Sequence, residues 1–413
     1  MYARPADRLA ESPLAREARD LIRSCVHCGF CLPACPTYRI TGNELDSPRG
    51  RIYLIKELIE QGTANETART HLDRCLTCRA CETACPSGVK YGQLADLGRE
   101  LIEESPPSPR PSLERFVRFT LLKVATRRSL FSPLVRTGQL VRPWLPAVLR
   151  SMVPPRAPTP SWPVARHARR MAVLQGCVQP GLAPQINAAA ARVLDRLGIS
   201  LVAAEDVGCC GAMDHHLGQA DAALEKVRRN VAASARMLDA GVECIVSTAS
   251  GCGVFAKDYG HAMRHEPDET RRTAVRVGAA TRDLSEVIDP TALRSLVAGN
   301  VKRVRVAWQA PCSLQHGQRA ATAGKVEALL RAAGCELVAV RNPTLCCGSA
   351  GTYSILQPEL SHELRARKIS SLVVEQPDVI ATANIGCLEH LRQESPVPVK
   401  HWIEIVDEAF TRE

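Results

Sequence analysis

Two cysteine runs decide how this chain folds: CVHCGFCLPACP at residues 25–36 and CLTCRACETACP at residues 75–86. Each is a complete C-x2-C-x2-C-x3-C-P run. Such a run gives three thiolates from one tight loop to a cubane 4Fe-4S cluster, and its fourth cysteine, turned away by the following proline, binds the other cluster. We therefore predict one cluster on Cys25, Cys28, Cys31 and Cys85, and a second on Cys75, Cys78, Cys81 and Cys35.

Zinc is the alternative metal for these cysteines. Zinc ribbons use paired C-x2-C knuckles and need neither the third nor the fourth cysteine at this spacing. The whole chain has 18 cysteines in 413 residues, a density too high for incidental thiols and too low for a small disulfide scaffold. The pattern favours iron–sulfur clusters over zinc and over a structural role without metal.

The sequence between and beside the two runs is typical of helices. Residues 50–61 have apolar side chains at positions 52, 54, 55, 58 and 59, close to helical spacing. Residues 14–22 and 91–102 have the same character. Because 39 residues separate Cys35 from Cys75, more than a short β-hairpin needs, we predict an α-helical ferredoxin domain over residues 1–105.

The net charge of +10 is concentrated in one segment. Residues 101–170 hold 13 basic and 3 acidic side chains, while the rest of the chain is nearly balanced. The segment is also rich in proline, which breaks helices and marks linkers, so we expect a connector over residues 106–168. Residues 1–21 are charged and no run of 18 apolar residues occurs, so we expect neither a secretory signal nor a membrane-spanning segment.

An amphipathic helix is expected inside this connector, over residues 113–124, with apolar residues at 113, 116, 117, 121 and 124 on one face. A basic face with aromatic anchors suits an anionic membrane surface or an acidic partner subunit, here through residues 113–150; a solvated helix is the alternative. Nucleic-acid binding is not expected, because no nucleic-acid-binding motif accompanies the charge. The other helix faces hold Arg115, Arg118, Arg127 and Arg128, and the aromatic anchors are Phe131 and Trp144.

Beyond the connector, the sequence repeats itself at a period of about 136 residues. Three cysteine landmarks recur at nearly constant offset, which predicts two copies of one domain, over residues 169–298 and 299–413. In the first copy they are Cys177, Cys209-Cys210-Gly211 and Cys252, and in the second Cys312, Cys346-Cys347-Gly348 and Cys387.

Short apolar runs alternate with helical stretches in each copy, which predicts α/β domains with parallel sheets. The cysteines then fall near strand ends, where open α/β sheets place ligands. The expected strands are 171–174, 199–203, 244–246, 304–308, 336–340 and 379–381, and the expected helices are 185–197, 220–238, 325–333 and 358–372.

Each copy therefore has four convergent thiols that could hold iron or zinc. The alternative is that they are buried apolar thiols. Cys244 and Cys335 lie outside the repeated landmarks, and we expect both to be ordinary core residues.

Taken together, the motifs resemble the iron–sulfur subunits of bacterial glycolate oxidase (glycolate dehydrogenase) over essentially the whole chain. More widely, they resemble the iron–sulfur subunits of anaerobic glycerol-3-phosphate dehydrogenase, lactate-utilisation proteins and the CCG subunit of heterodisulfide reductase. The stretches that carry the resemblance are CVHCGFCLPACPTY (25–38), NELDSPRGRIYLIKELIE (43–60), CLTCRACETACPSGV (75–89), the two CCG domains and HWIEIVDE (401–408).

The resemblance implies an electron-transfer subunit of an oxidoreductase complex rather than the site of substrate oxidation. Hydride chemistry belongs to a flavin, and this chain has no G-x-G-x-x-G fingerprint. FAD-binding partner subunits would oxidise glycolate to glyoxylate, and the two clusters would pass electrons toward a membrane quinone. We accordingly expect a cytoplasmic protein, peripheral on the cytoplasmic face of the inner membrane. Alternatives are a glycerol-3-phosphate or lactate version of this subunit, or a thiol-disulfide reductase of the CCG type.

One departure from the wider family weakens the reductase alternative. Heterodisulfide reductase relatives end each CCG domain in C-x-x-C, whereas here Phe255 and His390 stand where the last cysteine would be. His390 is a candidate ligand, with a surface histidine as the equal alternative, and His215, His216 and His316 are expected to be loop histidines. A third iron–sulfur cluster or zinc is thus expected first on Cys312, Cys346, Cys347, Cys387 and His390, and less on Cys177, Cys209, Cys210 and Cys252.

Overall fold

The computed structural model describes residues 1–105, 110–146, 150, 153–156, 161–204, 206–297 and 303–411. The chain forms two compact units, each assembled from separate segments. The first unit contains Met1–Leu122, Met213–Ala223 and Thr344–Arg365, and the second contains Lys123–Ala212, Leu224–Pro343 and Ala366–Glu413. A short segment that follows the first CCG motif and one that contains the second thus belong to the unit of the N-terminal helices. The domain boundaries expected at residues 106 and 298–299 lie outside the described residues.

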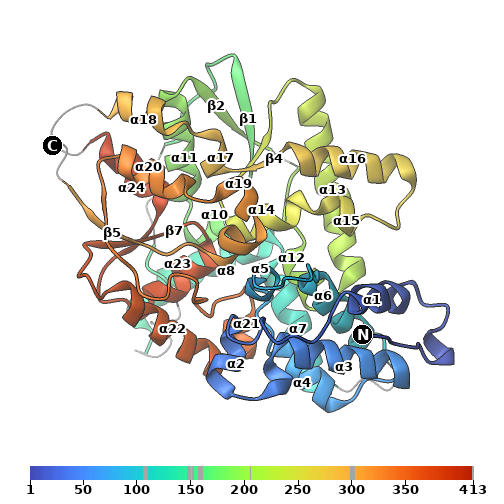
Figure 1. The fold of residues 1–413 in the computed structure, drawn as a ribbon. Coiled ribbons are helices and arrows are strands. Elements are labelled where there is room, and N and C mark those ends of the chain that lie inside the picture. The colour runs from blue at the N-terminus through green and yellow to red at the C-terminus, as the bar shows by residue number, and fades with distance from the viewer. Residues whose placement is uncertain are drawn as a thin grey trace. The chain divides into compact units, whose positions relative to one another are not determined.

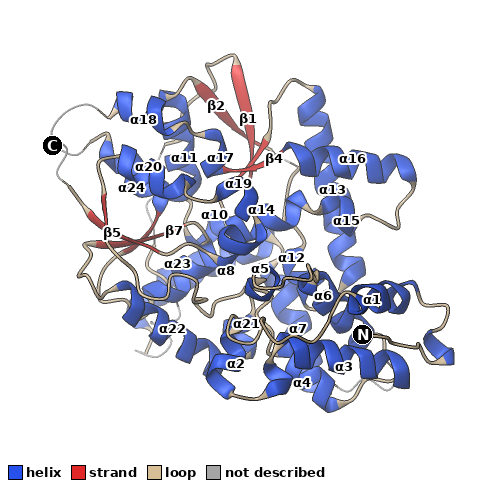
Figure 2. Cartoon of the chain, viewed as in Figure 1, coloured by secondary structure: helices blue, strands red, loops and turns tan. Residues whose placement is uncertain are grey.

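The first unit contains only helices among the residues that the structure describes (Figures 1 and 2). The helices predicted over 14–22, 50–61 and 91–102 are confirmed. Four helices, α7, α12, α13 and α22, continue from one unit into the other. The helices are η1 (Asp7–Leu9), α1 (Pro13–Arg23), α2 (Pro36–Thr41), η2 (Glu44–Asp46), α3 (Pro48–Gln61), α4 (Glu66–Asp73), α5 (Ala80–Thr83), α6 (Tyr91–Glu103), α7 (Ser112–Ala125), α12 (Ala212–His216), α13 (Ala220–Asp239), α21 (Tyr353–Leu356) and α22 (Pro358–Leu372).

Proline and glycine set the limits of the helices beside the first cysteine run. Pro36 is the first residue of α2 and Pro48 the first of α3, where the missing N–H costs nothing. The Ser47 hydroxyl caps α3 by accepting from Gly50 N–H at 3.0 Å. Both helices end at a glycine in the left-handed conformation, Gly42 and Gly62. The Cys-Pro end of the first run therefore leads directly into α2.

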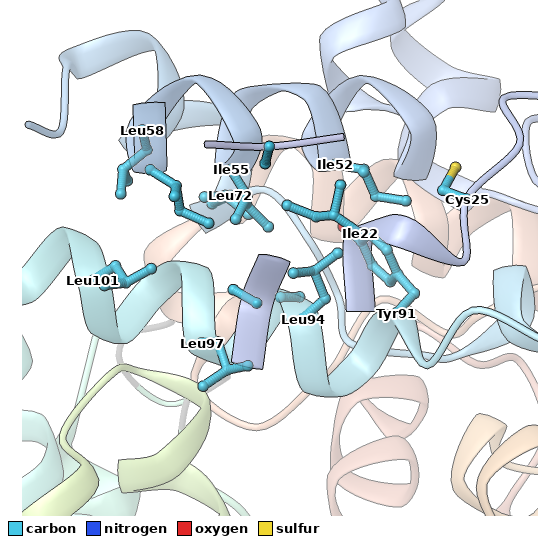
Figure 3. Packing of buried hydrophobic residues seen from close by; sticks show 14 of the residues in the cluster. Ile22, Cys25, Ile52, Ile55, Leu58, Leu72, Tyr91, Leu94, Leu97 and Leu101 are labelled. Carbon is cyan, nitrogen blue, oxygen red and sulfur yellow. The ribbon is translucent and has the colours of Figure 1, made fainter. Parts of the chain in front are cut away.

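The core of the first unit lies between α1, α3, α4 and α6 (Figure 3). The apolar positions predicted on α3 are all buried: Ile52, Leu54, Ile55, Leu58 and Ile59. Each such side chain contributes about 1.5–3 kcal/mol on burial. This core holds the two cysteine loops on a rigid base.

The second unit contains two four-stranded parallel sheets, in the orders β2-β1-β3-β4 and β6-β5-β7-β8. The shared order confirms the internal repeat and the α/β class, and a strand or helix lies at every predicted place in the repeat. The strand predicted over 336–340 is shorter than expected, because only Glu336–Leu337 pairs with its neighbour. Sequence reasoning missed β4 and β8, because runs of three residues have no detectable alternation. The strands are β1 (Arg169–Leu174), β2 (Ile199–Ala203), β3 (Ile245–Ser247), β4 (Thr281–Asp283), β5 (Arg305–Trp308), β6 (Glu336–Leu337), β7 (Val379–Thr382) and β8 (Val399–His401).

Helices cover these sheets and follow the strand ends near which the repeated cysteines lie. In the part of the chain that the structure describes, no helix is long and apolar enough to span a bilayer. The helices are α8 (Arg128–Val141), η3 (Arg142–Trp144), α10 (Gln179–Leu182), α11 (Gln185–Arg196), α14 (Ser250–Lys257), α15 (Tyr259–Ala262), α16 (Asp268–Ala280), α17 (Leu284–Val287), α18 (Pro290–Leu296), η4 (Ser313–Gly317), α19 (Arg319–Thr322), α20 (Lys325–Ala332), α23 (Ile385–Arg392) and α24 (Trp402–Ala409).

Candidate metal centres

The two cysteine loops share an unusual backbone. Residues at equivalent places, His27 and Thr77, have φ of 56° and 50°, and Gly29 and Arg79 have φ of 85° and 61°. Non-glycine residues adopt this left-handed region at an energetic cost, and such residues gather at functional sites. Both loops therefore turn in the same way and present their cysteines alike.

The cysteines predicted for the first cluster lie around one cavity. Cys25, Cys28, Cys31 and Cys85 line a pocket that opens to solvent, and Cys81 also lines it. Burial raises the pKa of the Cys31 thiol to about 11, whereas Cys28 is exposed. Cys85 comes from the second run, so the geometry has the crossing that the motif predicts. A cubane cluster needs four thiolates, and this set supplies them; the ligand assignment itself stays a prediction.

The other four cysteines form a second, more buried group. Burial raises the pKa of Cys81, and the nearby Cys78, Cys75 and Cys35 raise it further. Burial also raises the pKa of Cys35, which lies within electrostatic range of Cys78. Cys35 thus lies near cysteines of the other run, and its assignment to their cluster stays a prediction. This set also fits the donor requirement of a cubane cluster.

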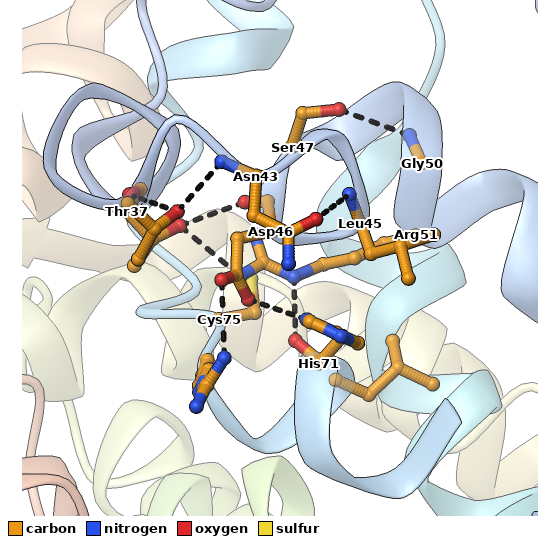
Figure 4. A network of polar contacts seen from close by, with 12 residues as sticks. Thr37, Asn43, Leu45, Asp46, Ser47, Gly50, Arg51, His71 and Cys75 are labelled. Atoms are coloured by element: carbon orange, nitrogen blue, oxygen red, sulfur yellow. Dashed lines mark hydrogen bonds and ion pairs between the residues drawn. The ribbon is translucent and has the colours of Figure 1, made fainter. Parts of the chain in front are cut away.

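A buried polar network lies beside Cys35 (Figure 4). Arg51 Nε donates to the carbonyl oxygen of His71 at 2.6 Å, Nη2 donates to Thr37 Oγ1 at 3.1 Å, and Nη1 lies 3.9 Å from Cys35 Sγ. The Asp46 carboxylate lies 3.6 Å from Arg51 Nη2. Sequence reasoning missed this network, although its residues fall within or near the stretches that carry the family resemblance.

The buried carboxylate of Asp46 is shared among several donors. It lies 2.7 Å from His71 Nδ1 and 3.2 Å from Arg74 Nη1. Its place depends on Gly50, because a Cβ there would lie 2.1 Å from the carbonyl oxygen of Glu44. The glycine lets η2 pass directly over the first turn of α3.

Cys75 receives two hydrogen bonds in the same buried region. Tyr91 donates its hydroxyl to Cys75 Sγ at 3.6 Å, and the Thr77 N–H donates to the same sulfur at 3.4 Å. Burial raises the pKa of Tyr91, so its hydroxyl remains a donor. Hydrogen bonds to cluster sulfurs are one of the factors that set reduction potential.

The first repeat brings its four landmark thiols together. Cys177 and Cys210 lie close enough to Cys209 to change its pKa, and Cys252 acts on both Cys177 and Cys210. The two neighbouring thiols lower the pKa of Cys209 well below its ordinary value. Phe255 packs edge-on against Tyr259 with ring centroids 5.8 Å apart. The predicted convergence is therefore present in the copy for which we expected metal less.

The second repeat differs because its landmark cysteines are divided between the units. Cys346 and Cys347 belong to the first unit, and Cys312 and Cys387 to the second. His390 is 5% exposed, so the surface-histidine alternative is wrong. Its position one turn after Cys387 on α23 gives it a packed environment that sequence periodicity did not reveal.

The remaining cysteines and histidines also have definite surroundings. Cys244 and Cys335 are buried, as expected for core residues.

The expectation of loop histidines was wrong, because His215 and His216 end helix α12 and His316 lies in the π-helical turn η4. Burial by itself would raise the pKa of Asp96, but His216 and His215 lower it. His216 Nδ1 lies 3.0 Å from the Asp96 carboxylate.

No group of three or more His, Cys, Asp or Glu side chains in the described ranges has the geometry of a site for one metal ion. In a cubane cluster the thiolates bind different irons, so this finding concerns single-ion sites.

The helix predicted over 113–124 is present as α7, but the prediction that Arg118 lies on an outer basic face was wrong. Arg118 lies 2.7 Å from the Asp73 carboxylate and is buried, and Arg110 lies 2.8 Å from the same group. Burial by itself would raise the pKa of Asp73, but the two guanidinium groups lower it. The apolar side chains Leu113 and Phe116 are 75% and 65% exposed. Helical periodicity identified the faces of α7, and the buried carboxylate decided which arginine turned inward.

The two aromatic anchors also differ from each other. Phe131 packs at Gly181 of α10, with ring carbon 3.3 Å from the position of a Cβ there, whereas Trp144 is 80% exposed. Only Trp144 is therefore a free aromatic anchor. Residues 147–149 of the expected contact segment lie outside the described residues.

Comparisons with known proteins match the N-terminal part of the chain and the two repeats to known domain families. Residues 22–89 match the 4Fe-4S dicluster domain family, and residues 171–256 and 306–392 match the cysteine-rich domain family. The chain is 43% identical over 417 residues to the glycolate oxidase iron-sulfur subunit of Escherichia coli (strain K12), covering 100% of both chains. It is 31% identical to the probable glycolate oxidase iron-sulfur subunit of Bacillus subtilis (strain 168), over 89% of this chain and 88% of the relative.

A more distant similarity covers part of the chain. Lactate utilization protein A of Geobacillus thermodenitrificans (strain NG80-2) is 27% identical over 54% of this chain and 92% of its own length. The Escherichia coli subunit matches the whole chain, including the cysteine loops and both repeats, and the Bacillus subtilis subunit matches 89% of it. The chain belongs to the family of glycolate oxidase iron–sulfur subunits.

Proposed function

We propose that this chain is the electron-transfer subunit of a glycolate dehydrogenase complex. FAD-binding partner subunits oxidise glycolate to glyoxylate, and this chain carries the electrons toward a membrane quinone. The observation that supports this most directly is the crossed arrangement of eight cysteines into two groups of four. When bound, a cubane cluster accepts and releases one electron at a time.

The chain's own residues act as ligands and as an electrostatic frame. Cys28 is exposed and flanked by Val26 and Phe30, which are 67% and 63% exposed, so the first site is open to a redox partner. Cys35 and Cys75 are buried, so the second site is shielded from water. No catalytic side chain is assigned, because the hydride step belongs to the flavin.

Iron quantitation and EPR on anaerobically purified protein test the cluster content. Two cubane clusters give about eight irons per chain and a reducible cluster signal. Fewer than about four irons, without such a signal, would overturn the proposal. Co-purification with the FAD-binding subunits then tests the substrate: glycolate should reduce the clusters, whereas preferential reduction by lactate or glycerol 3-phosphate would favour the alternative versions of this subunit.

An additional metal centre in the first repeat is the second part of the proposal. Its support is the proximity of four thiols, Cys177, Cys209, Cys210 and Cys252, which shift one another's pKa. A third cluster would raise the iron content to about twelve, and Cys209→Ser would return it to about eight. Turnover of a disulfide by the isolated chain would instead favour thiol-disulfide chemistry.

Peripheral attachment to the cytoplasmic face of the inner membrane is the third part. The exposed apolar side chains of α7 and the exposed Trp144 support it, because a basic segment with apolar anchors binds anionic lipid surfaces. A carbonate wash of membranes, with and without the partner subunits, tests it. Retention of the chain only when the partners are present would show attachment through protein and overturn direct lipid binding.

A further inference from the structure

The two predicted cluster sites lie in different electrostatic surroundings. The first opens to solvent at Cys28, where water screens nearby charges. At the second, Cys35, Cys75 and Cys81 are buried. A fixed charge acts more strongly on the second site, because the effective dielectric constant of the interior is lower than that of water.

Two buried cations lie against this second site. Arg99 donates to the carbonyl oxygen of Cys75 at 2.6 Å and is paired with Asp96 at 3.3 Å, whereas Arg51 approaches a ligand sulfur. Arg51 is 1% exposed and its Nη1 lies 3.9 Å from Cys35 Sγ. Its side chain is held in place by the carbonyl oxygen of His71 and by Thr37 Oγ1 (Figure 4). The guanidinium group is thus rigid and cannot turn away from the sulfur.

The Asp46 carboxylate only partly neutralises this cation. It lies 3.6 Å from Arg51, but it also lies 2.7 Å from His71 Nδ1 and 3.2 Å from Arg74. Two arginines therefore share one carboxylate. A net positive charge remains beside Cys35, in addition to the hydrogen bonds that Cys75 receives from Tyr91 and Thr77.

Resting on the cluster assignment proposed above, we propose that Arg51 raises the reduction potential of the cluster held by Cys35, Cys75, Cys78 and Cys81. When the chain holds a single electron, that electron therefore resides mainly on this cluster. Net charge and hydrogen bonds to the sulfurs are factors that set the potential of such clusters. Reduction adds one negative charge, which a fixed cation stabilises. Transfer moves one electron from the first site to the second, with no bond made or broken.

The test is an anaerobic potentiometric titration of the full chain, followed by EPR. Arg51→Gln should lower one of the two midpoint potentials and shift the electron's distribution between the clusters about tenfold, which is 59 mV for a one-electron couple. Arg51→Lys retains the charge and should recover more than half of that shift. Unchanged midpoints in Arg51→Gln, or equal shifts of both, with both clusters present, would overturn the proposal.

Two further variants make the outcome decisive. Arg49→Gln removes a partly exposed charge from the same helix, near Cys31, and should leave the midpoint affected by Arg51 unchanged. Asp46→Asn removes the opposing charge and should raise that midpoint, so it decides the question if Arg51→Gln fails to assemble the cluster. A fall in Asp46→Asn would overturn the proposal. Absence of reducible clusters in the unmodified protein would instead overturn the proposed function.

Discussion

Single side chains around Cys75 are expected to tune the second cluster by hydrogen bonding alone. Tyr91→Phe removes the hydroxyl 3.6 Å from Cys75 Sγ without changing any charge. We expect the midpoint of that cluster to fall by less than about 59 mV, a tenfold change for one electron, because donors to the sulfur stabilise the reduced state. Tyr53→Phe, on exposed α3 surface, is the matched control. Equal midpoints in all three proteins would contradict a role for the Tyr91 hydroxyl.

At the scale of elements, the two cysteine loops can be tested as a crossed pair. In the predicted assignment, Cys28→Ser/Cys85→Ser removes two ligands of one cluster, whereas Cys28→Ser/Cys35→Ser removes one ligand from each. We expect the first double variant to keep about four irons, and the second to lose most of both clusters. Iron quantitation and EPR distinguish them. The reverse result would mean that each run binds its own cluster.

Helix α7 is attached to the first unit through the charges that surround Asp73. Arg118→Met removes a buried charge-assisted contact at 2.7 Å and should cost about 2 kcal/mol in the free energy of unfolding. Arg115→Met changes an exposed arginine one turn earlier on the same helix, and its effect should stay within about 0.5 kcal/mol. Chemical denaturation measures both. Equal effects would mean that the Asp73 contact contributes no more than a surface charge.

At the scale of the whole molecule, the second unit has a pH-sensitive contact between its two repeats. His401 belongs to the second repeat, and its Nε2–H donates to the carbonyl oxygen of Thr248 of the first at 2.9 Å. Its Nδ1 accepts from Ile403 N–H at 3.3 Å, capping α24. Burial lowers the pKa of His401 to about 4, and the neutral ring satisfies both contacts.

The sign of the pH effect follows from this lowered pKa. Between about pH 6.5 and pH 4 the unfolded chain binds a proton at His401 that the folded chain does not, so stability falls as the pH falls. This histidine should cost about 1 kcal/mol at pH 5.5 relative to pH 7.5. His401→Gln should show a smaller fall in Tm over that range than the unmodified protein. The control His265→Gln, at an exposed histidine, should show the same fall in Tm as the unmodified protein.

Asp283 provides an internal check on this prediction. It caps α17 in the first repeat, the position that His401 has in the second. Burial raises the pKa of Asp283 to about 6, so its contribution to stability is lost as the pH rises through that region. Asp283→Asn should therefore make the loss of stability at low pH steeper. An unchanged slope in both the His401 and the Asp283 variants would contradict both assignments.

The sequence by itself determined the features that depend on local spacing. The cysteine runs indicated two crossed groups of four, the apolar pattern of residues 50–61 predicted α3 and its buried face, and the matched landmarks predicted two parallel-sheet domains. The structure confirms α3 and the two parallel sheets, and the family comparisons agree with a 4Fe-4S dicluster domain and two cysteine-rich domains. The crossed ligand assignment stays a prediction. Local spacing suffices because ligand geometry and the periods of helix and strand are set by near neighbours in the chain.

Only the tertiary structure decided the features that join distant residues. Asp46 meets His71 and Arg74, and Arg118 turns toward Asp73. The segment after the first CCG motif and the segment that contains the second belong to the first unit. The burial of His390 and the contact between His401 and Thr248 belong to the same class. A buried charge is tolerated where a partner of opposite charge or a hydrogen bond meets it. That partner can lie far away in the sequence, so periodicity and composition have no signal for it.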